Sequence, residues 1–205
     1  MTRIAVIDHG AGNLVSIAQG LAVAGAEVEV VERPSGLEGA DGIVLPGVGS
    51  AAAAFERITA AGFVGPLRSA VVPLLGVCVG LQLLFDGSDE DDAGGLGLIP
   101  GRVRRLQGAP RLPHIGWNDL AIVRPDPLFE GIADGQTFYF VHSFAPVPDE
   151  PDTVVARSDY GQPFVAAARR GAVAGVQFHP ERSGDPGLRI LANFVGETGR
   201  ADRAA

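Results

Sequence analysis

The chain has 205 residues, a formal net charge of −8 at pH 7 and a hydrophobic content of 46%. This length suits one domain with a full hydrophobic core, and no apolar run is long enough to span a membrane. The acidic balance argues against nucleic acid or an anionic membrane as the main partner.

Short buried strands alternate with helical segments through the first 85 residues. The hydrophobic pattern predicts strands over residues 4–7, 28–31, 42–45 and 73–77. Helices are predicted from Asn13 or Ser16 to Ala24, after the N-cap candidate Ser50, and over residues 79–85. This alternation predicts a parallel sheet with helices on both faces.

The second half of the chain is richer in strands. Residues 86–95 are acidic and glycine-rich, which predicts a mobile, solvated loop. Strands separated by Pro and Gly are then predicted over residues 102–106, 120–123, 137–144, 154–158 and 164–169. We interpret them as antiparallel additions to, or extensions of, the central sheet. A buried strand over 173–177 and a helix over 187–195 complete one domain spanning 1–198, and residues 199–205 are expected to be a frayed tail.

The cysteine content and the N-terminus indicate the compartment. One cysteine permits no internal disulfide, which fits a reducing cytoplasm. Residues Met1-Thr2-Arg3 lead directly into an apolar strand, so we expect no separable signal peptide and a cytoplasmic protein.

The only cysteine, Cys78, lies where a strand is predicted to turn sharply into a helix. It is flanked by Gly76 and Gly80, which leave room for the turn and for a substrate to approach the backbone, as in a nucleophile elbow. A helix N-terminus also favours the thiolate, which is the attacking species. A lone cysteine is commonly a small buried hydrophobic residue, so the motif alone leaves both interpretations open.

A cysteine nucleophile needs a base and a group that orients the base. Of the four histidines, His179 is the best candidate, because it follows a buried strand and ligands gather at the carboxyl ends of parallel strands. Glu181 lies two residues further on, where it can reach the same side of an extended segment. Alone, His-Pro-Glu is more often a surface turn; combined with Cys78, it favours a Cys-His-acid triad.

Acyl transfer also requires donors for the oxyanion. The N–H of Val79 is one candidate, and residues 46–49 (Pro-Gly-Val-Gly) are the other, although the same pattern suits a simple strand-to-helix turn. No Lys-Ser/Thr pair follows these glycines, as a P-loop requires. The histidines lack zinc-site spacing, and one thiol excludes a multi-cysteine site, so no metal or cofactor is expected.

Several segments together resemble class I (triad-type) glutamine amidotransferases. Within that class they are similar to the glutaminase subunits of imidazole glycerol phosphate synthases, in order along the chain from Ile4 to Ser183. The matching segments cover residues 7–13, 45–49, 76–82, 95–101, 112–118, 139–143 and 177–183.

The resemblance implies a fold, an activity and a set of site residues. The fold is a flavodoxin-like three-layer α/β sandwich, with a mostly parallel sheet and antiparallel additions in the C-terminal half. Cys78 would attack the carboxamide of glutamine, His179 would shuttle protons, and Glu181 would orient His179. The remaining implied roles are glutamine binding by Gln82, Glu90, His142, Ser143 and Phe144, and oxyanion binding by Gly47 and Val48 together with Val79.

The resemblance also implies a partner. In this family the ammonia passes to a (β/α)8 barrel cyclase subunit, which makes imidazole glycerol phosphate and aminoimidazole carboxamide ribotide in histidine biosynthesis. The two subunits form a heterodimer, and the glutaminase is poorly active until the cyclase binds its ligand and the oxyanion loop rearranges. Residues in motifs that resemble the docking surface are Asn13, Trp117, Asn118 and Tyr139.

Small departures from the family pattern leave the triad intact. His9 and Phe144 stand where Tyr is common, and Val77 and Val79 replace the usual Ile and Leu. Two other interpretations remain: a non-catalytic binding subunit, and another elbow-cysteine enzyme such as the glutaminase of pyridoxal phosphate synthesis or a γ-glutamyl hydrolase. The intact Cys-His-Glu set argues against the first, and the segments around Trp117 and Tyr139 fit the second less well.

Overall fold

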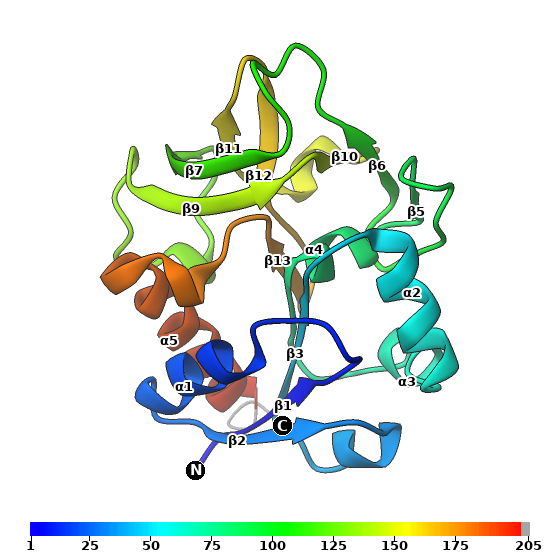
Figure 1. The fold of residues 1–205 in the computed structure, drawn as a ribbon. Helices are drawn as coiled ribbons and strands as arrows, with labels where there is room; N and C mark the ends of the chain where they lie inside the picture. Colours follow the sequence, from blue (N-terminus) through cyan, green and yellow to red (C-terminus); the bar gives the residue numbers. More distant parts are fainter. Residues whose placement is uncertain (202–205) are drawn as a thin grey trace.

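The computed structural model describes residues 1–201, and its centre is one eight-stranded sheet. The strand order is β2-β1-β3-β4-β13-β12-β11-β8, with β2 through β13 parallel and the last three strands antiparallel (Figure 1). The parallel part has the flavodoxin-like order, which confirms the predicted fold class. The strands are β1 (Arg3–Ile7), β2 (Glu27–Val31), β3 (Gly42–Gly47), β4 (Leu74–Cys78), β8 (Ala121–Ile122), β11 (Val154–Asp159), β12 (Pro163–Arg170) and β13 (Val173–Val176).

Helices cover both faces of the parallel part. In Figure 1, α1 (Leu14–Val23) and α5 (Gly184–Ala201) lie on one side, and α2 (Ala51–Ala60) and α3 (Val64–Arg68) on the other. Gly20 of α1 leaves no room for a side chain, because an added Cβ would lie 2.5 Å from Leu191 of α5. Ser50 caps α2 as predicted, its Oγ accepting from the N–H of Ala53.

The C-terminal helix differs from the prediction in length. α5 begins at Gly184 and continues to Ala201, three residues into the segment for which fraying was expected. The rest of that segment, residues 202–205, lies outside the described residues. Short 3₁₀ turns occupy Pro34–Leu37, Pro127–Phe129, Pro151–Thr153 and Pro180–Arg182.

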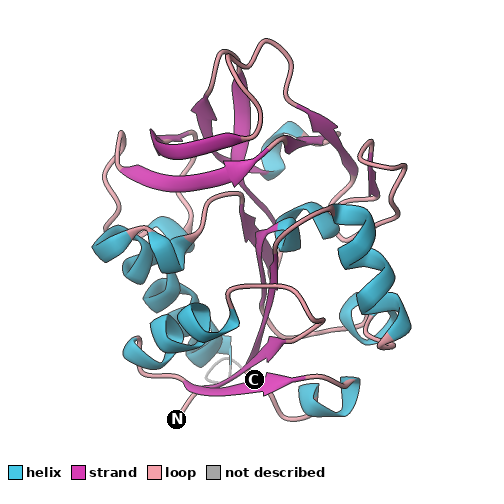
Figure 2. Cartoon of the chain, viewed as in Figure 1, coloured by secondary structure: helices cyan, strands magenta, loops and turns pink. Residues whose placement is uncertain are grey.

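Part of the strand-rich half leaves the central sheet, which corrects the prediction (Figure 2). β8, β11 and β12 are antiparallel additions as expected, but five strands form two smaller sheets: β5 (Gly87–Ser88), β6 (Gly101–Arg105) and β10 (Phe144–Pro148) in one, and β7 (His114–Asp119) and β9 (Thr137–His142) in the other. The strand predicted over 137–144 breaks at Ser143. Pro146 and Pro148 lack an N–H, which suits β10 to the edge position that it occupies.

The segment predicted to be a solvated acidic loop is only partly solvated. Asp91 and Asp92 are exposed, but Ser88 is buried in β5. Arg102 of β6 contacts Asp89 and Asp92 at 2.6 Å each. Neutralisation by this arginine lets the acidic segment fold back against β6.

Aromatic packing places the β7–β9 pair over the end of the parallel sheet. Phe138 and Phe140 of β9 are completely buried, and each contacts the equally buried Phe178, which follows β13. Each buried phenylalanine stabilises the fold by about 1.5–3 kcal/mol. This cluster joins the two halves of the chain beside His179.

Candidate active site

Cys78 ends β4 at a strained turn. Its backbone has φ +56° and ψ −110°, which costs a non-glycine residue about 1–3 kcal/mol, and α4 (Val79–Leu83) starts at the next residue. An added Cβ at Gly76 would lie 2.6 Å from the carbonyl oxygen of Gly80, and one at Gly80 would overlap the carbonyl oxygen of Leu45. The flanking glycines are therefore required by space, and the predicted elbow is present.

His179 meets Cys78 at the carboxyl edge of the sheet, as predicted. β13 is the parallel neighbour of β4, with Val176 opposite Val77, so residues after the two strands emerge together. His179 Nδ1 donates to Glu181 Oε1 at 2.9 Å, and the same ring interacts electrostatically with the Cys78 side chain. The three predicted catalytic residues thus form one connected Cys-His-Glu group.

The electrostatics of the triad favour a charged imidazole. Burial lowers the pKa of His179, but hydrogen bonds to Cys78 and Glu181 and the negative charge of both groups raise it more, to about 10. His179 is then an imidazolium at neutral pH. Glu181 Oε2 is buried and has no hydrogen-bond partner among the described residues, so His179 is the side chain that compensates this carboxylate.

Backbone contacts hold the His-Pro-Glu segment against β9. The N–H of His179 donates to the carbonyl of Tyr139 at 2.9 Å, and Ser183 Oγ donates to the carbonyl of His179 at 2.6 Å. The N–H of Tyr139 donates in turn to Ser183 Oγ at 3.0 Å. The imidazole of His179 is therefore positioned by the strand pair and not by a free loop.

The predicted oxyanion residues lie beside the elbow. Gly47 of β3 is paired with Cys78, and an added Cβ there would lie 2.9 Å from the Cβ of Val79. Val48 is 39% exposed, and Gly49 has φ +85°, a conformation that favours glycine. Val79 is the first residue of α4, where helical N–H groups have no intrahelical acceptor. His9, at a family Tyr position, contacts the carbonyl of Pro46 through Nε2 at 2.8 Å.

Gln82 is buried next to the nucleophile and bonds two groups. Its Nε2 donates to the carbonyl of Phe144 at 3.0 Å and to Gln177 Oε1 at 3.1 Å. Gln177 Nε2 donates to Cys78 Sγ at 3.7 Å. Gln177 was not among the predicted site residues. Its position two residues before His179 was the available signal, because such spacing places two side chains on one side of an extended segment.

His142 supports the backbone of Phe144. Its Nδ1 donates to the carbonyl of Phe144 at 2.9 Å, and its Nε2 accepts from His114 Nδ1 at 3.1 Å. Burial lowers the pKa of His142 to about 4 and also lowers the pKa of His114, so both rings are neutral at pH 7. Both nitrogens of His142 are thus occupied by protein groups.

Two other predicted glutamine-binding residues lie between strands, Ser143 between β9 and β10 and Glu90 between β5 and β6. The carbonyl of Ser143 accepts from the N–H of Leu106 at 3.0 Å. Glu90 Oε2 accepts from the N–H of Ala51 at 2.7 Å, at the N-terminus of α2. Since α2 directly follows the 46–49 loop, Glu90 connects the acidic segment to the oxyanion loop.

The predicted docking residues lie on β7, β9 and α1. Trp117 is 58% exposed and packs edge-on against Tyr139, whose ring is also covered by Arg182 at 4.3 Å. Asn118 Nδ2 donates to the carbonyl of Asp159 at 2.6 Å. Asn13 is the N-cap of α1, a helix that contacts the Pro180–Arg182 turn.

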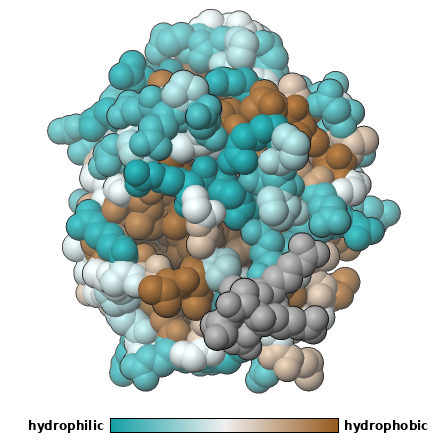
Figure 3. Space-filling view, turned by 180° about the vertical axis from the view of Figure 1, so that it is seen from behind, coloured by the Kyte–Doolittle hydropathy of each residue, from teal (hydrophilic) through white to brown (hydrophobic). Residues whose placement is uncertain are grey.

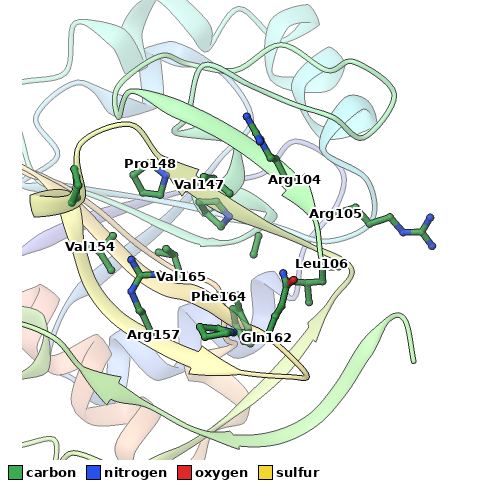
Figure 4. Close-up of a pocket in the computed structure, with 14 residues that line it drawn as sticks. Arg104, Arg105, Leu106, Val147, Pro148, Val154, Arg157, Gln162, Phe164 and Val165 are labelled. Atoms are coloured by element: carbon green, nitrogen blue, oxygen red, sulfur yellow. The ribbon is translucent and has the colours of Figure 1, made fainter. Parts of the chain in front are cut away.

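Among the described residues, a second cavity offers no comparable chemistry. A cavity of about 280 Å³ between β6–β10 and β11–β12 contains no triad residue, and its arginines do not converge, since Arg105 extends away from it (Figure 4). Seen from behind, hydrophobic side chains gather in separate patches among hydrophilic ones (Figure 3). Within residues 1–201, no helix is long and apolar enough to cross a membrane.

Comparison with known proteins agrees with this geometry. A family model described as "Glutamine amidotransferase class-I" matches residues 5–198. The imidazole glycerol phosphate synthase subunit HisH of Synechococcus sp. (strain JA-3-3Ab) is 50% identical over 200 residues, covering 94% of this chain and 93% of that protein. The protein of the same name from Halobacterium salinarum is 48% identical over 207 residues, covering 94% of this chain and 92% of that protein.

Solved structures share the fold at lower identity. A Thermoplasma acidophilum protein superposes with a TM-score of 0.78 at 22% identity, covering 100% of this chain and 97% of that one. A crystal structure of a glutamine amidotransferase superposes with a TM-score of 0.71 at 24% identity, covering 94% of this chain and 98% of that one. At these identities the likeness establishes the fold alone.

Proposed function

The chain belongs to the class-I glutamine amidotransferase family, and from this premise we propose that it hydrolyses L-glutamine to L-glutamate and ammonia through a cysteine thioester. The observation that carries the proposal is the connected Cys78-His179-Glu181 group at the carboxyl edge of the sheet. Its geometry supports nucleophilic attack by a thiolate and proton transfer by an imidazole that a carboxylate orients.

The chemistry follows from the charge state of the triad. The Cys78 thiolate attacks the carboxamide carbon, and the oxyanion forms beside the N–H of Val79 and the 47–48 backbone. The imidazolium of His179 gives its proton to the departing nitrogen, which leaves as ammonia, and a γ-glutamyl thioester remains. Neutral His179 then takes a proton from water, the hydroxide attacks the thioester, and glutamate leaves as the thiolate is restored.

We assign glutamine binding to Gln82, Glu90, His142, Ser143 and Phe144. The contacts of these residues suggest a division of labour: Ser143 and Phe144 present strand-end backbone and side chain to the ligand. Gln82 and His142 act through the carbonyl of Phe144, which accepts from both. Glu90 is next to the start of α2, within reach of an α-amino group that arrives beside the 46–49 loop.

We also propose that the ammonia passes to a (β/α)8 barrel cyclase subunit of imidazole glycerol phosphate synthase, for histidine biosynthesis in the cytoplasm. The printed names of relatives at 46–50% identity support this partner. Exposed Trp117, packed against half-buried Tyr139, offers an aromatic docking patch close to His179, with Asn118 next to Trp117 on β7 and Asn13 at the start of α1. Aromatic residues of this kind are enriched at protein interfaces.

The test is ammonia release from glutamine by the purified chain, with and without the cyclase and its ribotide ligand. We expect low activity alone and strong stimulation by the ligand-bound cyclase, and no activity for Cys78→Ala with its fold retained. Activity that persists in Cys78→Ala with the cyclase present would contradict the assignment. An inactive wild-type chain with a bound cyclase would favour the non-catalytic binding subunit.

A further inference from the structure

Gln177 is a completely buried polar side chain that touches the nucleophile, and the mechanism above does not use it. Gln177 is 0% exposed. The side-chain Nε2 donates to Cys78 Sγ at 3.7 Å, and the side-chain Oε1 accepts from Gln82 Nε2 at 3.1 Å. Burying an amide is costly unless its donors and acceptors are bonded. The Gln177 amide meets this requirement by contacting the sulfur.

The orientation of this amide is determined by a backbone carbonyl. The carbonyl oxygen of Phe144 can only accept, so the side chain of Gln82 must present its NH2 group there, at 3.0 Å. The same NH2 donates to Gln177, which must therefore present its oxygen to Gln82 and its own NH2 to Cys78. His142 donates to the same carbonyl and accepts from His114, so the anchor is itself held by two side chains of the β7–β9 pair.

The surroundings of the sulfur distinguish its two protonation states. The carbonyl of Val141 lies 3.7 Å from Sγ and can accept only from the thiol. The Gln177 N–H can donate only to a sulfur lone pair, and such a bond is stronger when the acceptor is charged. Gln177 therefore favours the thiolate, and it does so in every protonation state of His179.

We propose that Gln177 is a catalytic residue that stabilises the Cys78 thiolate through its side-chain N–H, and that Gln82 is the positioning residue that holds Gln177 in the productive orientation. During the reaction, His179 gives up its proton to ammonia and is neutral until water is deprotonated. When the thioester breaks, His179 is an imidazolium again, and the Gln177 N–H stabilises the returning negative charge of the sulfur together with it. The role in turnover rests on the proposed glutaminase function, whereas the stabilisation of the thiolate does not.

The experiment measures alkylation of Cys78 by iodoacetamide as a function of pH. Cys78 is the only cysteine in the chain, so the alkylation rate reports this sulfur alone. In Gln177→Met, which keeps the volume and removes the N–H, we expect the pH midpoint of alkylation to rise by about one unit and kcat to fall about tenfold. KM for glutamine is expected to change little. Gln107→Met, at an exposed glutamine, is the matched control and keeps the wild-type midpoint.

A second variant separates this role from a structural one. Gln82→Met leaves Gln177 in place and removes the group that orients it, so we expect the pH midpoint of alkylation to rise by a smaller amount. This variant also provides the test if Gln177→Met fails to fold. An unchanged midpoint in a folded Gln177→Met chain, or in Gln82→Met where only that variant folds, would overturn the proposal. A wild-type chain that releases no ammonia while these midpoint shifts hold would contradict the glutaminase function and leave the stabilisation of the thiolate standing.

Discussion

The parallel half of the molecule and the β7–β9 pair contribute differently to one site. β3, β4 and β13 deliver Gly47, Cys78 and His179 to a single edge because parallel strands end together. The β7–β9 pair and the start of β10 deliver backbone oxygens, those of Tyr139, Val141 and Phe144. The groups proposed to react thus come from the sheet, whereas the backbone groups that orient them come from a separate layer packed over it.

The largest effect is expected from the triad's acid. Glu181→Gln removes the negative charge that His179 faces at 2.9 Å, so the imidazolium is less stabilised and less well oriented. We expect kcat for glutamine hydrolysis to fall by about 10³-fold or more, with the fold retained. Steady-state ammonia release with the cyclase present measures this effect. Glu56→Gln, at an exposed glutamate of α2, should have wild-type activity, and equal activities in the two variants would remove Glu181 from the triad.

A backbone variant tests the parallel half directly. Gly80→Ala would bring a methyl group onto the carbonyl of Leu45 in β3, so β3 and α4 must separate. We expect a loss of more than about 3 kcal/mol in the free energy of unfolding, measured by urea denaturation. Gly65→Ala is the control, because a Cβ there meets nothing within 4 Å. A stability of Gly80→Ala within experimental error of wild type would show that the elbow is not tightly packed.

Acid pH should lower the stability of the fold through His142, which lies in the β7–β9 pair. The folded-state pKa of His142 is about 4, below its ordinary value of 6.5, because burial disfavours the charged ring. The unfolded state then binds more protons in this range, so stability present above pH 6.5 is lost as the pH falls toward 4. In His142→Asn, the decline in the free energy of unfolding between pH 6.5 and pH 4.5 should be shallower than in wild type. If the free energy of unfolding declines equally in both proteins, groups other than His142 cause the acid sensitivity.

The smallest effect on stability is expected at the docking patch. Trp117 is 58% exposed, so Trp117→Ala should change the free energy of unfolding by less than about 1 kcal/mol. The affinity for the cyclase should fall about tenfold or more, because aromatic residues dominate interface energetics. Calorimetric titration with the cyclase measures the loss, and Val71→Ala, at an exposed position on the opposite end of the sheet, is the control. If Trp117→Ala binds the cyclase with wild-type affinity, the docking surface does not include Trp117 of β7.

Local patterns predicted the parallel half and the placement of Cys78, His179 and Glu181 at one edge of the sheet. The apolar runs of β1, β3, β4 and β13 are continuous; Cys78 ends β4, and His179 lies three residues beyond the end of β13. β7 was not predicted, because Gly116 and the polar residues around Trp117 are unfavourable in strands. The contacts of Gln177 and of the His114–His142 pair depend on pairing between distant strands, and no local spacing encodes that pairing.

The most direct test of the central claim is to trap the covalent intermediate. The chain, with the cyclase and its ligand bound, is mixed with glutamine, quenched in acid and examined by intact-mass and peptide mass spectrometry. We predict a γ-glutamyl adduct on the peptide that contains Cys78, absent in Cys78→Ala. Ammonia release without any adduct, and undiminished in Cys78→Ala, would contradict the account.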